Sequence, residues 1–181
     1  ASYIMNCRQM GIKVMPPGIN NGFGNFSTTD EGIIYGLSAI KSVGRPVIDA
    51  IVNERKNGKY IDLQDFVKRL SGKEVNKRTV ESFIKSGALD ELGGNRKQKM
   101  LIFGQLIDDT NSDRKANTAG QMSLFEFDTE GANDYNKVEY PNVPEYAKEE
   151  LLGYEKEVLG IYVSGHPLDE HSDIMNKNIT H

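Results

Sequence analysis

The sequence predicts a mainly α-helical fold, with a compact helical domain, a small β-hairpin and a flexible acidic C-terminal segment. Three observations support this prediction. Apolar residues recur at helical spacing between residues 36 and 107, and strand-like runs are strong only near residues 25–35. Large apolar residues almost vanish between residues 108 and 142. Short helices joined by short loops are typical of a compact α-helical domain.

The uneven distribution of charge is informative about partners. Residues 1–100 hold 16 Lys and Arg against 10 Asp and Glu, whereas residues 101–181 hold 6 against 16. The basic half is suited to meet a polyanion, although unevenly spread surface charge is an alternative. A single cysteine, Cys7, excludes an internal disulfide, and no apolar run approaches the roughly 20 residues of a membrane span. We expect a cytoplasmic protein without a membrane partner.

Residues 1–35 form the first predicted unit. A helix over residues 2–10 is expected to end at Gly11, because glycine suits a left-handed cap. Two prolines then force an extended segment. Turn-forming residues 29–32 separate two strand-like runs, so we expect a small β-hairpin here.

Residues 36–108 form the second predicted unit, which contains five helices. The first is short, and the second begins after Gly44. The third and fourth begin at Asp62 and Asn76, whose side chains suit an N-cap, and the fifth begins at Asn95. The residues predicted to lie on the apolar faces of these helices are Leu37, Ile40, Val47, Ile48, Ile51, Val52, Leu63, Phe66, Val67, Leu70, Val80, Phe83, Ile84, Met100, Leu101, Phe103, Leu106 and Ile107.

The turn between the first two of these helices has the pattern of a helix-hairpin-helix. Val43 stands at its centre, where we expect it to anchor the turn in the core, and Gly44 lets the backbone approach a surface closely. Unpaired amides at the start of the next helix can bind a phosphate oxygen, while Lys41 and Arg45 add charge. An ordinary helix–helix loop with Gly44 only as a cap is the alternative.

A second pair of helices meets near residues 83–90 but lacks the Gly-apolar-Gly turn. Two such units related by a pseudo-twofold axis could touch both strands of a duplex through its backbone. We therefore add Lys85, Gly87 and Arg96 to the predicted DNA-binding residues. Ser42 is included too, although such hairpins usually carry a second glycine there. The alternative is that the second unit only supports the first.

Residues 109–143 are predicted to be a flexible linker, interrupted by one short apolar run. Leu124 and Phe125 stand side by side in it, with Gln121 as a hydrogen-bonding group just before them. Such a peptide suits a preformed pocket on a partner, and a contact back onto the parent domain is the alternative. Residues 144–181 are expected to form a helix that starts at Pro144, followed by an extended segment.

Evidence for catalysis is weak. Ser164 and His166 are close in sequence, but no nucleophile-elbow pattern precedes them, so a hydrolase is a distant alternative. The histidines are too scattered for a metal site, and no pair of carboxylates suggests bound magnesium. We expect no catalytic residue, metal or cofactor in this chain.

Six sequence blocks occur in order along the chain. They are Cys-x-x-Met-Gly-Ile-x-Val-x-Pro-Pro-x-Ile-Asn over residues 7–20, Gly-Leu-x-Ala-Ile-Lys-x-Val-Gly over residues 36–44, Val-Asn-Lys-Arg over residues 75–78, Ile-Lys-Ser-Gly-Ala-Leu-Asp over residues 84–90, Gly-Gln-x-Ser-Leu-Phe over residues 120–125 and Glu-Lys-Glu-x-Leu-Gly-x-Tyr-x-Ser-Gly-His-Pro-Leu over residues 155–168. Across nearly the whole chain this series resembles the bacterial DNA polymerase III alpha subunit.

The resemblance implies a fragment that begins at the end of the fingers region. A tandem helix-hairpin-helix domain follows and holds double-stranded DNA behind the active site, and the chain then leads towards a missing OB-fold. The parent would be a DNA-directed DNA polymerase whose catalytic aspartates and Mg²⁺ ions lie outside this chain. The opening Ala-Ser and the ending Thr-His agree with a piece of a larger protein.

The resemblance also implies partners. Gln-x-x-Leu-Phe resembles the motif that binds the beta sliding clamp, which assigns that contact to Gln121, Met122, Ser123, Leu124 and Phe125. Other DNA polymerase III subunits would be partners through the parent, at the replication fork on the nucleoid. A stand-alone helix-hairpin-helix protein of DNA repair, or another structure-specific DNA-binding protein, is the alternative.

Overall fold

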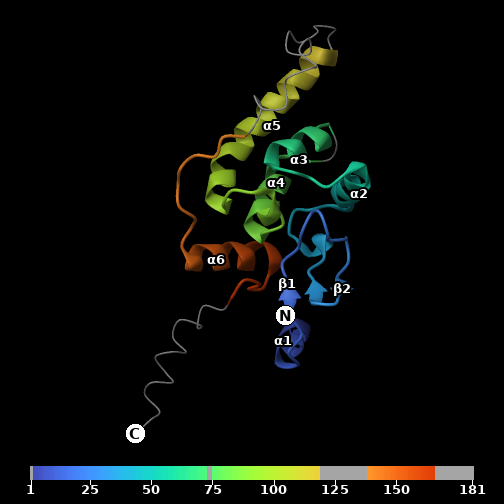
Figure 1. Cartoon of the computed structure of the whole chain (residues 1–181), viewed down its shortest axis with the longest axis vertical. Coiled ribbons are helices and arrows are strands. Elements are labelled where there is room, and N and C mark those ends of the chain that lie inside the picture. The colour runs from blue at the N-terminus through green and yellow to red at the C-terminus, as the bar shows by residue number, and fades with distance from the viewer. Residues whose placement is uncertain (1, 73–74, 119–137, 166–181) are drawn as a thin grey trace.

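Helices dominate the computed structural model, which describes residues 2–72, 75–118 and 138–165. The long helix α5 (Arg96–Thr118) packs against both α3 (Leu63–Leu70) and α4 (Lys77–Ser86), as Figure 1 shows. Helix α6 (Lys148–Leu159) packs across α4, and α2 (Arg45–Glu54) packs against α3. The mainly helical fold class predicted from the sequence is confirmed.

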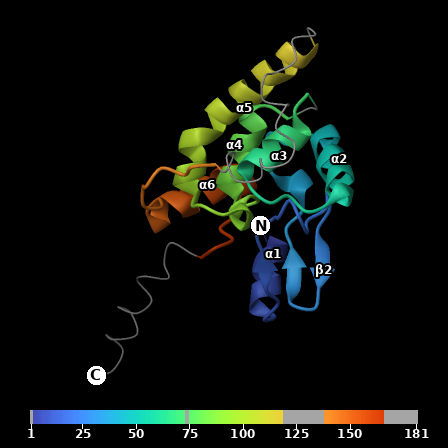
Figure 2. The same cartoon turned by 45° about the horizontal axis from the view of Figure 1, so that its top comes forward.

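A small three-stranded sheet lies beside α1 (Ser2–Gln9), away from the C-terminal end of α5 (Figure 2). Strands β2 (Ser27–Thr29) and β3 (Gly32–Ile34) form the predicted antiparallel hairpin. Strand β1 (Val14–Met15) pairs in parallel with β3 and was not predicted, because two residues are too few to show a period.

Gly32 explains how β1 comes to lie next to the hairpin. It adopts φ +146°, and a Cβ atom there would stand 2.2 Å from the carbonyl oxygen of Lys13. That same carbonyl accepts a hydrogen bond from the amide of Ile33 at 2.9 Å. Only glycine therefore allows the chain before β1 to approach β3 this closely.

The caps predicted for α3 and α4 are present. The Asp62 carboxylate accepts a hydrogen bond from the amide of Asp65 at 2.8 Å, and the Asn76 side chain accepts one from Thr79 at 3.0 Å. Helix α4 ends at Gly87, whose φ of +81° is the left-handed cap that glycine favours. Local side-chain chemistry thus sets these boundaries.

One hydrophobic core runs through the helical layers into the sheet. Phe66 lies at its centre and meets Tyr60 and Phe83 edge to face, with ring centroids 5.1 and 6.0 Å apart. Three short 3-10 helices among the described residues, Leu37–Ala39, Arg55–Asn57 and Asp90–Leu92, connect the longer elements. The predicted apolar face of α5 is wrong at Leu101, which is 59% exposed.

Helices α5 and α6 each differ from the prediction at one boundary. Helix α5 continues to Thr118, ten residues into the segment predicted to be a flexible linker. No glycine or proline interrupts it there, and the hydroxyls of Thr110 and Ser112 donate to carbonyls one turn earlier. Helix α6 starts at Lys148 and not at Pro144, because the preceding residues run extended along the start of α5.

A buried ion-pair cluster joins α6 to the start of α5. Arg96 donates to Asp90 at 2.8 Å and to Glu155 at 3.2 Å, and the Glu155 side chain is completely buried. The other Glu155 oxygen accepts hydrogen bonds from the amides of Val163 and Ser164, at 2.8 and 3.0 Å. One carboxylate therefore satisfies a buried cation and two backbone amides.

We expect Glu155→Ala to destabilise the fold by about 3–5 kcal/mol, because it leaves Arg96 buried with one partner fewer and removes the acceptor of two amides. Denaturant unfolding followed by circular dichroism measures the change. Glu157→Gln is the matched control on the same helix: its carboxylate pairs with Lys85 but is half exposed, so the loss should stay below about 1 kcal/mol. Equal losses in the two variants would contradict a special role for Glu155.

Candidate nucleic-acid interface

The predicted hairpin forms a tight bend between the 3-10 helix Leu37–Ala39 and α2. Leu37 and Ile40 are buried, and Val43 packs half-buried against the same core, as predicted for the anchor of the turn. The amide of Val43 donates to the carbonyl of Ile40 at 3.3 Å. This amide is therefore already used within the turn.

The element before the bend is a single 3-10 turn, where the sequence predicted a short helix up to Lys41. Ile40 is already extended, with φ −78° and ψ 125°. The amide of Lys41 donates to the carbonyl of Val158 in α6 at 2.8 Å, so a contact with a distant helix replaces helical continuation. The back of the bend is thereby fixed to the core, and its other side faces outward.

Ser42 adopts the left-handed conformation, with φ +66°, as the only residue other than glycine that does so among the described residues. This is the position where the sequence suggested that a glycine would be usual. A Cβ atom makes the left-handed region unfavourable by about 1–2 kcal/mol per residue. The bend therefore forms with serine, but with backbone strain.

Helix α2 begins without a side-chain cap. Its N-cap residue is Gly44, in an extended conformation, and Pro46 lies in its first turn. No residue of the described part of the chain accepts a hydrogen bond from the amides of Gly44 and Arg45, which are both exposed. Helices α3 and α4 carry side-chain caps and α2 does not, so the N-terminus of α2 is open for an external acceptor.

Gly44 is not required by the fold. Its φ is −85°, and a Cβ atom added there would meet only the ring of Pro46, at 3.6 Å. An alanine would therefore fit without strain inside the protein. The absence of a side chain here leaves room for a surface that approaches from outside.

Basic side chains surround the bend. Lys41 and Arg45 are exposed, and neither forms an ion pair with any residue that the structure describes. A small cavity of about 130 Å³ beside the bend is lined by Lys41, Ser42 and Arg78. Glu81 and Glu157 also line it, and both of these carboxylates pair with Lys85. Arg78 was not among the predicted site residues, because only the fold brings α4 next to the hairpin.

The three predicted residues of the second unit have partners inside the chain. Arg96 is buried in the cluster with Glu155, and the left-handed Gly87 packs so closely that a Cβ atom would lie 2.3 Å from the Arg96 guanidinium. Lys85 pairs with Glu81 at 2.9 Å and with Glu157 at 3.1 Å. Burial alone would lower the pKa of Lys85, but hydrogen bonds to these carboxylates raise it on balance.

The N-terminus of α5 is occupied by a carboxylate of the same chain. Glu145 accepts hydrogen bonds from the amides of Arg96 and Lys97, at 2.9 and 3.1 Å. Burial raises the pKa of Glu145, but three backbone amides and the Arg96 charge outweigh it and lower the pKa overall. This geometry favours the alternative in which the second unit supports the first.

Residues 138–147, which we call the strap, hold Glu145 in this position. The side chains of Asn95 and Gln98 donate to carbonyls of the strap at Val143 and Pro141, at 3.0 and 2.8 Å. The strap thus crosses the start of α5, as Figure 1 shows, before α6 begins.

Two predictions from the sequence concern residues outside the described part of the chain. The peptide from Gln121 to Phe125 lies between the end of α5 and the strap, in residues 119–137. His166 is also outside, whereas Ser164 is described and donates its amide to Glu155. No group of three or more His, Cys, Asp or Glu side chains in the described ranges could hold a metal ion.

Comparison with known proteins shows what this chain is similar to. Residues 11–99 match the helix-hairpin-helix motif family. Over 170 residues the chain is 44% identical to the DNA polymerase III subunit alpha of Borreliella burgdorferi, an alignment that covers 93% of this chain and 15% of that relative. The chain is homologous to a segment of the DNA polymerase III alpha subunit.

Other relatives show similar identity over similar lengths of the chain. The DNA polymerase III subunit alpha of Vibrio cholerae is 39% identical over 173 residues, which cover 94% of this chain and 15% of the relative. The DNA polymerase III subunit alpha of Campylobacter jejuni is 39% identical over 182 residues, which cover 97% of this chain and 15% of that relative. The chain spans about 15% of the length of these relatives. Within the residues that the structure describes, no helix has the length and apolar character needed to span a membrane.

The left-handed Ser42 leads to a stability prediction. Ser42→Gly should raise the free energy of unfolding by about 0.5–1 kcal/mol, because glycine adopts φ +66° without the Cβ penalty but gains some freedom in the unfolded chain. Thermal and denaturant unfolding measure the effect. Ser42→Ala, which keeps the Cβ atom, is the control and should give no gain; a gain in both variants would show that the serine hydroxyl, and not the backbone, is the cause.

Proposed function

We propose that this chain is the DNA-holding segment of a replicative DNA polymerase, and that it grips the backbone of double-stranded DNA through the hairpin at residues 41–45. The observation that carries the proposal is the open N-terminus of α2, with exposed amides at Gly44 and Arg45 and no cap from the chain itself. Such amides, at the positive end of a helix dipole, bind phosphate oxygens.

Each residue of the bend has a distinct task in this proposal. Gly44 lets a phosphate come close to the backbone, and Val43 fixes the turn from behind. Lys41 and Arg45 add charge on both sides, while Ser42 offers a hydroxyl and its own amide. Arg78 extends the basic surface along the adjoining cavity.

Contacts of this type read the DNA backbone and not the base sequence. A module that moves along a template needs this property, because it must hold every sequence equally. We assign no catalytic residue to the chain. Template-directed phosphoryl transfer, with its Mg²⁺ ions, belongs in this proposal to other parts of the parent polymerase, which acts with its other subunits at the replication fork on the nucleoid.

We also propose that Gln121 to Phe125 bind the beta sliding clamp. A short peptide with two adjacent apolar anchors suits a preformed pocket, with an affinity for the isolated peptide near micromolar, or about −8 kcal/mol. Tethering to a clamp makes rebinding to DNA intramolecular and can raise overall avidity by about 10² to 10⁴. Weak duplex contacts would then be enough for processive synthesis.

A stand-alone DNA repair protein built on the same hairpin is the alternative. The relatives named above align with nearly all of this chain, including the segments before and after the hairpin region. This extent favours a polymerase segment, since a shared hairpin alone would explain similarity only around residues 11–99.

Charge reversal at the bend tests the DNA contact. We expect Lys41→Glu and Arg45→Glu each to weaken duplex binding about tenfold for all sequences, and to reduce the slope of log affinity against log salt by about one per lost phosphate contact. Fluorescence anisotropy with the 181-residue chain, at several salt concentrations, measures both effects.

Lys59→Glu is the matched control, because Lys59 is exposed and follows α2 at its other end. It makes the same change in net charge and should alter affinity only slightly. If all three variants lost the same duplex affinity, net charge alone would explain the effect. The assignment of the DNA contact to residues 41–45 would then be wrong. A change in sequence preference would also contradict a backbone contact.

Replacing both apolar anchors tests the clamp contact separately. Leu124→Ala with Phe125→Ala should abolish binding of the chain to a purified sliding clamp, because the peptide loses the groups that fill the pocket, while duplex affinity stays unchanged. Surface plasmon resonance with immobilised clamp measures this binding. Ser123→Ala, at a variable place of the motif, is the control; an unaffected titration with the double variant would reject the motif.

A further inference from the structure

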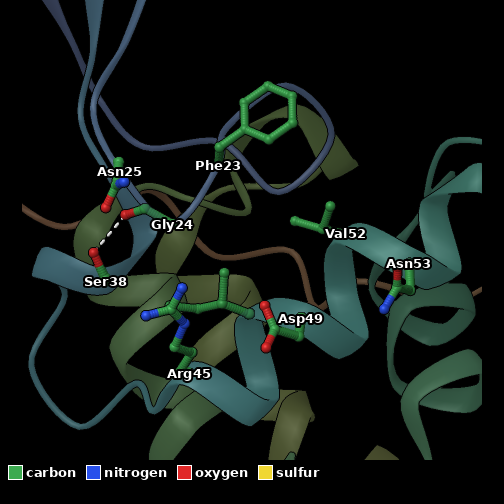
Figure 3. A pocket seen from close by; sticks show the side chains of 9 residues that line it. Phe23, Gly24, Asn25, Ser38, Arg45, Asp49, Val52 and Asn53 are labelled. Atoms are coloured by element: carbon green, nitrogen blue, oxygen red, sulfur yellow. Dashed lines mark hydrogen bonds between the residues drawn. The ribbon is translucent and has the colours of Figure 1, made fainter.

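A groove lies on the other side of the hairpin, between the loop at residues 22–26 and α2. Its volume is about 350 Å³, which is within the range of small-molecule sites. Figure 3 shows Phe23 and Asn25 on the loop along one side, with Ser38 next to Asn25, while Arg45 and Asp49 come from α2 on the opposite side. Ile48 and Val52 add apolar surface.

Phe23 is an exposed aromatic residue that the fold holds in place. Its side chain is 52% exposed, yet the Arg55 guanidinium lies 4.6 Å from the ring centroid. Arg55 is itself fixed by hydrogen bonds to the carbonyls of Ile19 and Gly22, and the carbonyl of Phe23 accepts the amide of Leu37 at 2.8 Å. An aromatic ring that is held in place and half exposed offers a preorganised stacking surface.

The groove has two charged side chains of opposite sign, one helical turn apart on α2. Arg45 belongs to the open N-terminus of α2, so a strand held there by a phosphate lies at the mouth of the groove. Asp49 follows one helical turn further along, and the described residues provide no ion-pair partner for it. The exposed carboxylate of Asp49 repels a second phosphate but accepts hydrogen bonds from neutral N–H groups.

We propose that this groove takes an unpaired nucleobase with an exocyclic amine, from the same strand whose phosphate the hairpin holds. The base would stack on Phe23 and donate its amine to Asp49, with Asn25 available for a further hydrogen bond. This inference rests on the proposed duplex contact at the hairpin. It adds a preference for the single-stranded end of a duplex, since a paired and stacked base cannot enter.

Continuity with the hairpin favours a nucleic acid over a peptide as the occupant. Arg45 contributes its amide to the open helix end and its side chain to the groove, so one ligand that meets both must carry a phosphate next to a planar group. A nucleotide has this combination. A peptide partner would remain the explanation if the groove made no difference to DNA binding.

The test compares three DNA probes on the 181-residue chain by fluorescence anisotropy. One is a blunt duplex, and the other two carry single-stranded overhangs of three cytosines or three thymines, with each polarity examined. We expect the cytosine overhang to bind about tenfold more tightly than the blunt duplex, because stacking on an aromatic side chain and the amine contact are both added. The thymine overhang has no exocyclic amine, so its affinity should rise less above that of the blunt duplex.

Two variants and one control assign the effect to the groove. Phe23→Leu keeps an apolar wall but removes the stacking face. The ratio of the affinity for overhanging duplexes to that for the blunt duplex should therefore fall towards one, while blunt-duplex affinity stays unchanged. Asp49→Asn should remove the preference for cytosine over thymine. Phe26→Leu is the control, since Phe26 is also about half exposed but does not line the groove.

The outcomes separate this inference from the proposed function. If the chain binds no DNA at all, the duplex contact itself is wrong. Equal affinity for blunt and overhanging duplexes would overturn the base-binding groove and leave the duplex contact intact. An overhang preference that survives in Phe23→Leu and Asp49→Asn, with unchanged thermal melting by circular dichroism, would place the unpaired base elsewhere.

Discussion

The buried carboxylate of Glu155 is the interaction on which the arrangement of the hairpin depends. It fixes α6 to the start of α5 through Arg96, and it ties down the chain after α6 through two amides. With α6 in this position, the carbonyl of Val158 accepts the amide of Lys41, and that of Leu159 accepts the Tyr35 hydroxyl. The bend is thereby held from behind, with the first amides of α2 directed outward.

The two helical pairs of the domain differ in what occupies the helix start. At α2 the N-cap is a glycine with open space around it, and at α5 a carboxylate from the strap already accepts the amides. A helix start can hold only one anion well, because the dipole charge is about half an elementary charge and acts over one turn. One pair therefore presents a surface for a ligand, while the other has its equivalent surface filled by the protein.

Much of the fold was predictable because local chemistry determines it. The caps at Asp62, Asn76 and Gly87 were read directly from residue type, and so was the Val43 turn. Other features depend on contacts distant in sequence. Strand β1 exists because Gly32 admits it, and the burial of Arg96 requires Glu155, 59 residues later. Sequence reasoning assigned Arg96 to DNA as an ordinary basic residue, since no local signal distinguishes a cation that is destined for a buried pair.

The strap has a mechanical consequence. It follows directly on the segment that contains the proposed clamp peptide. Side chains at the start of α5 fasten it at Pro141 and Val143, and the backbone amides of Arg96 and Lys97 fasten it at Glu145. A pull on the proposed clamp peptide would load these bonds first, and not the bend at residues 41–45. Tension at the strap therefore passes into the start of α5, which packs against α3 and α4 in the core.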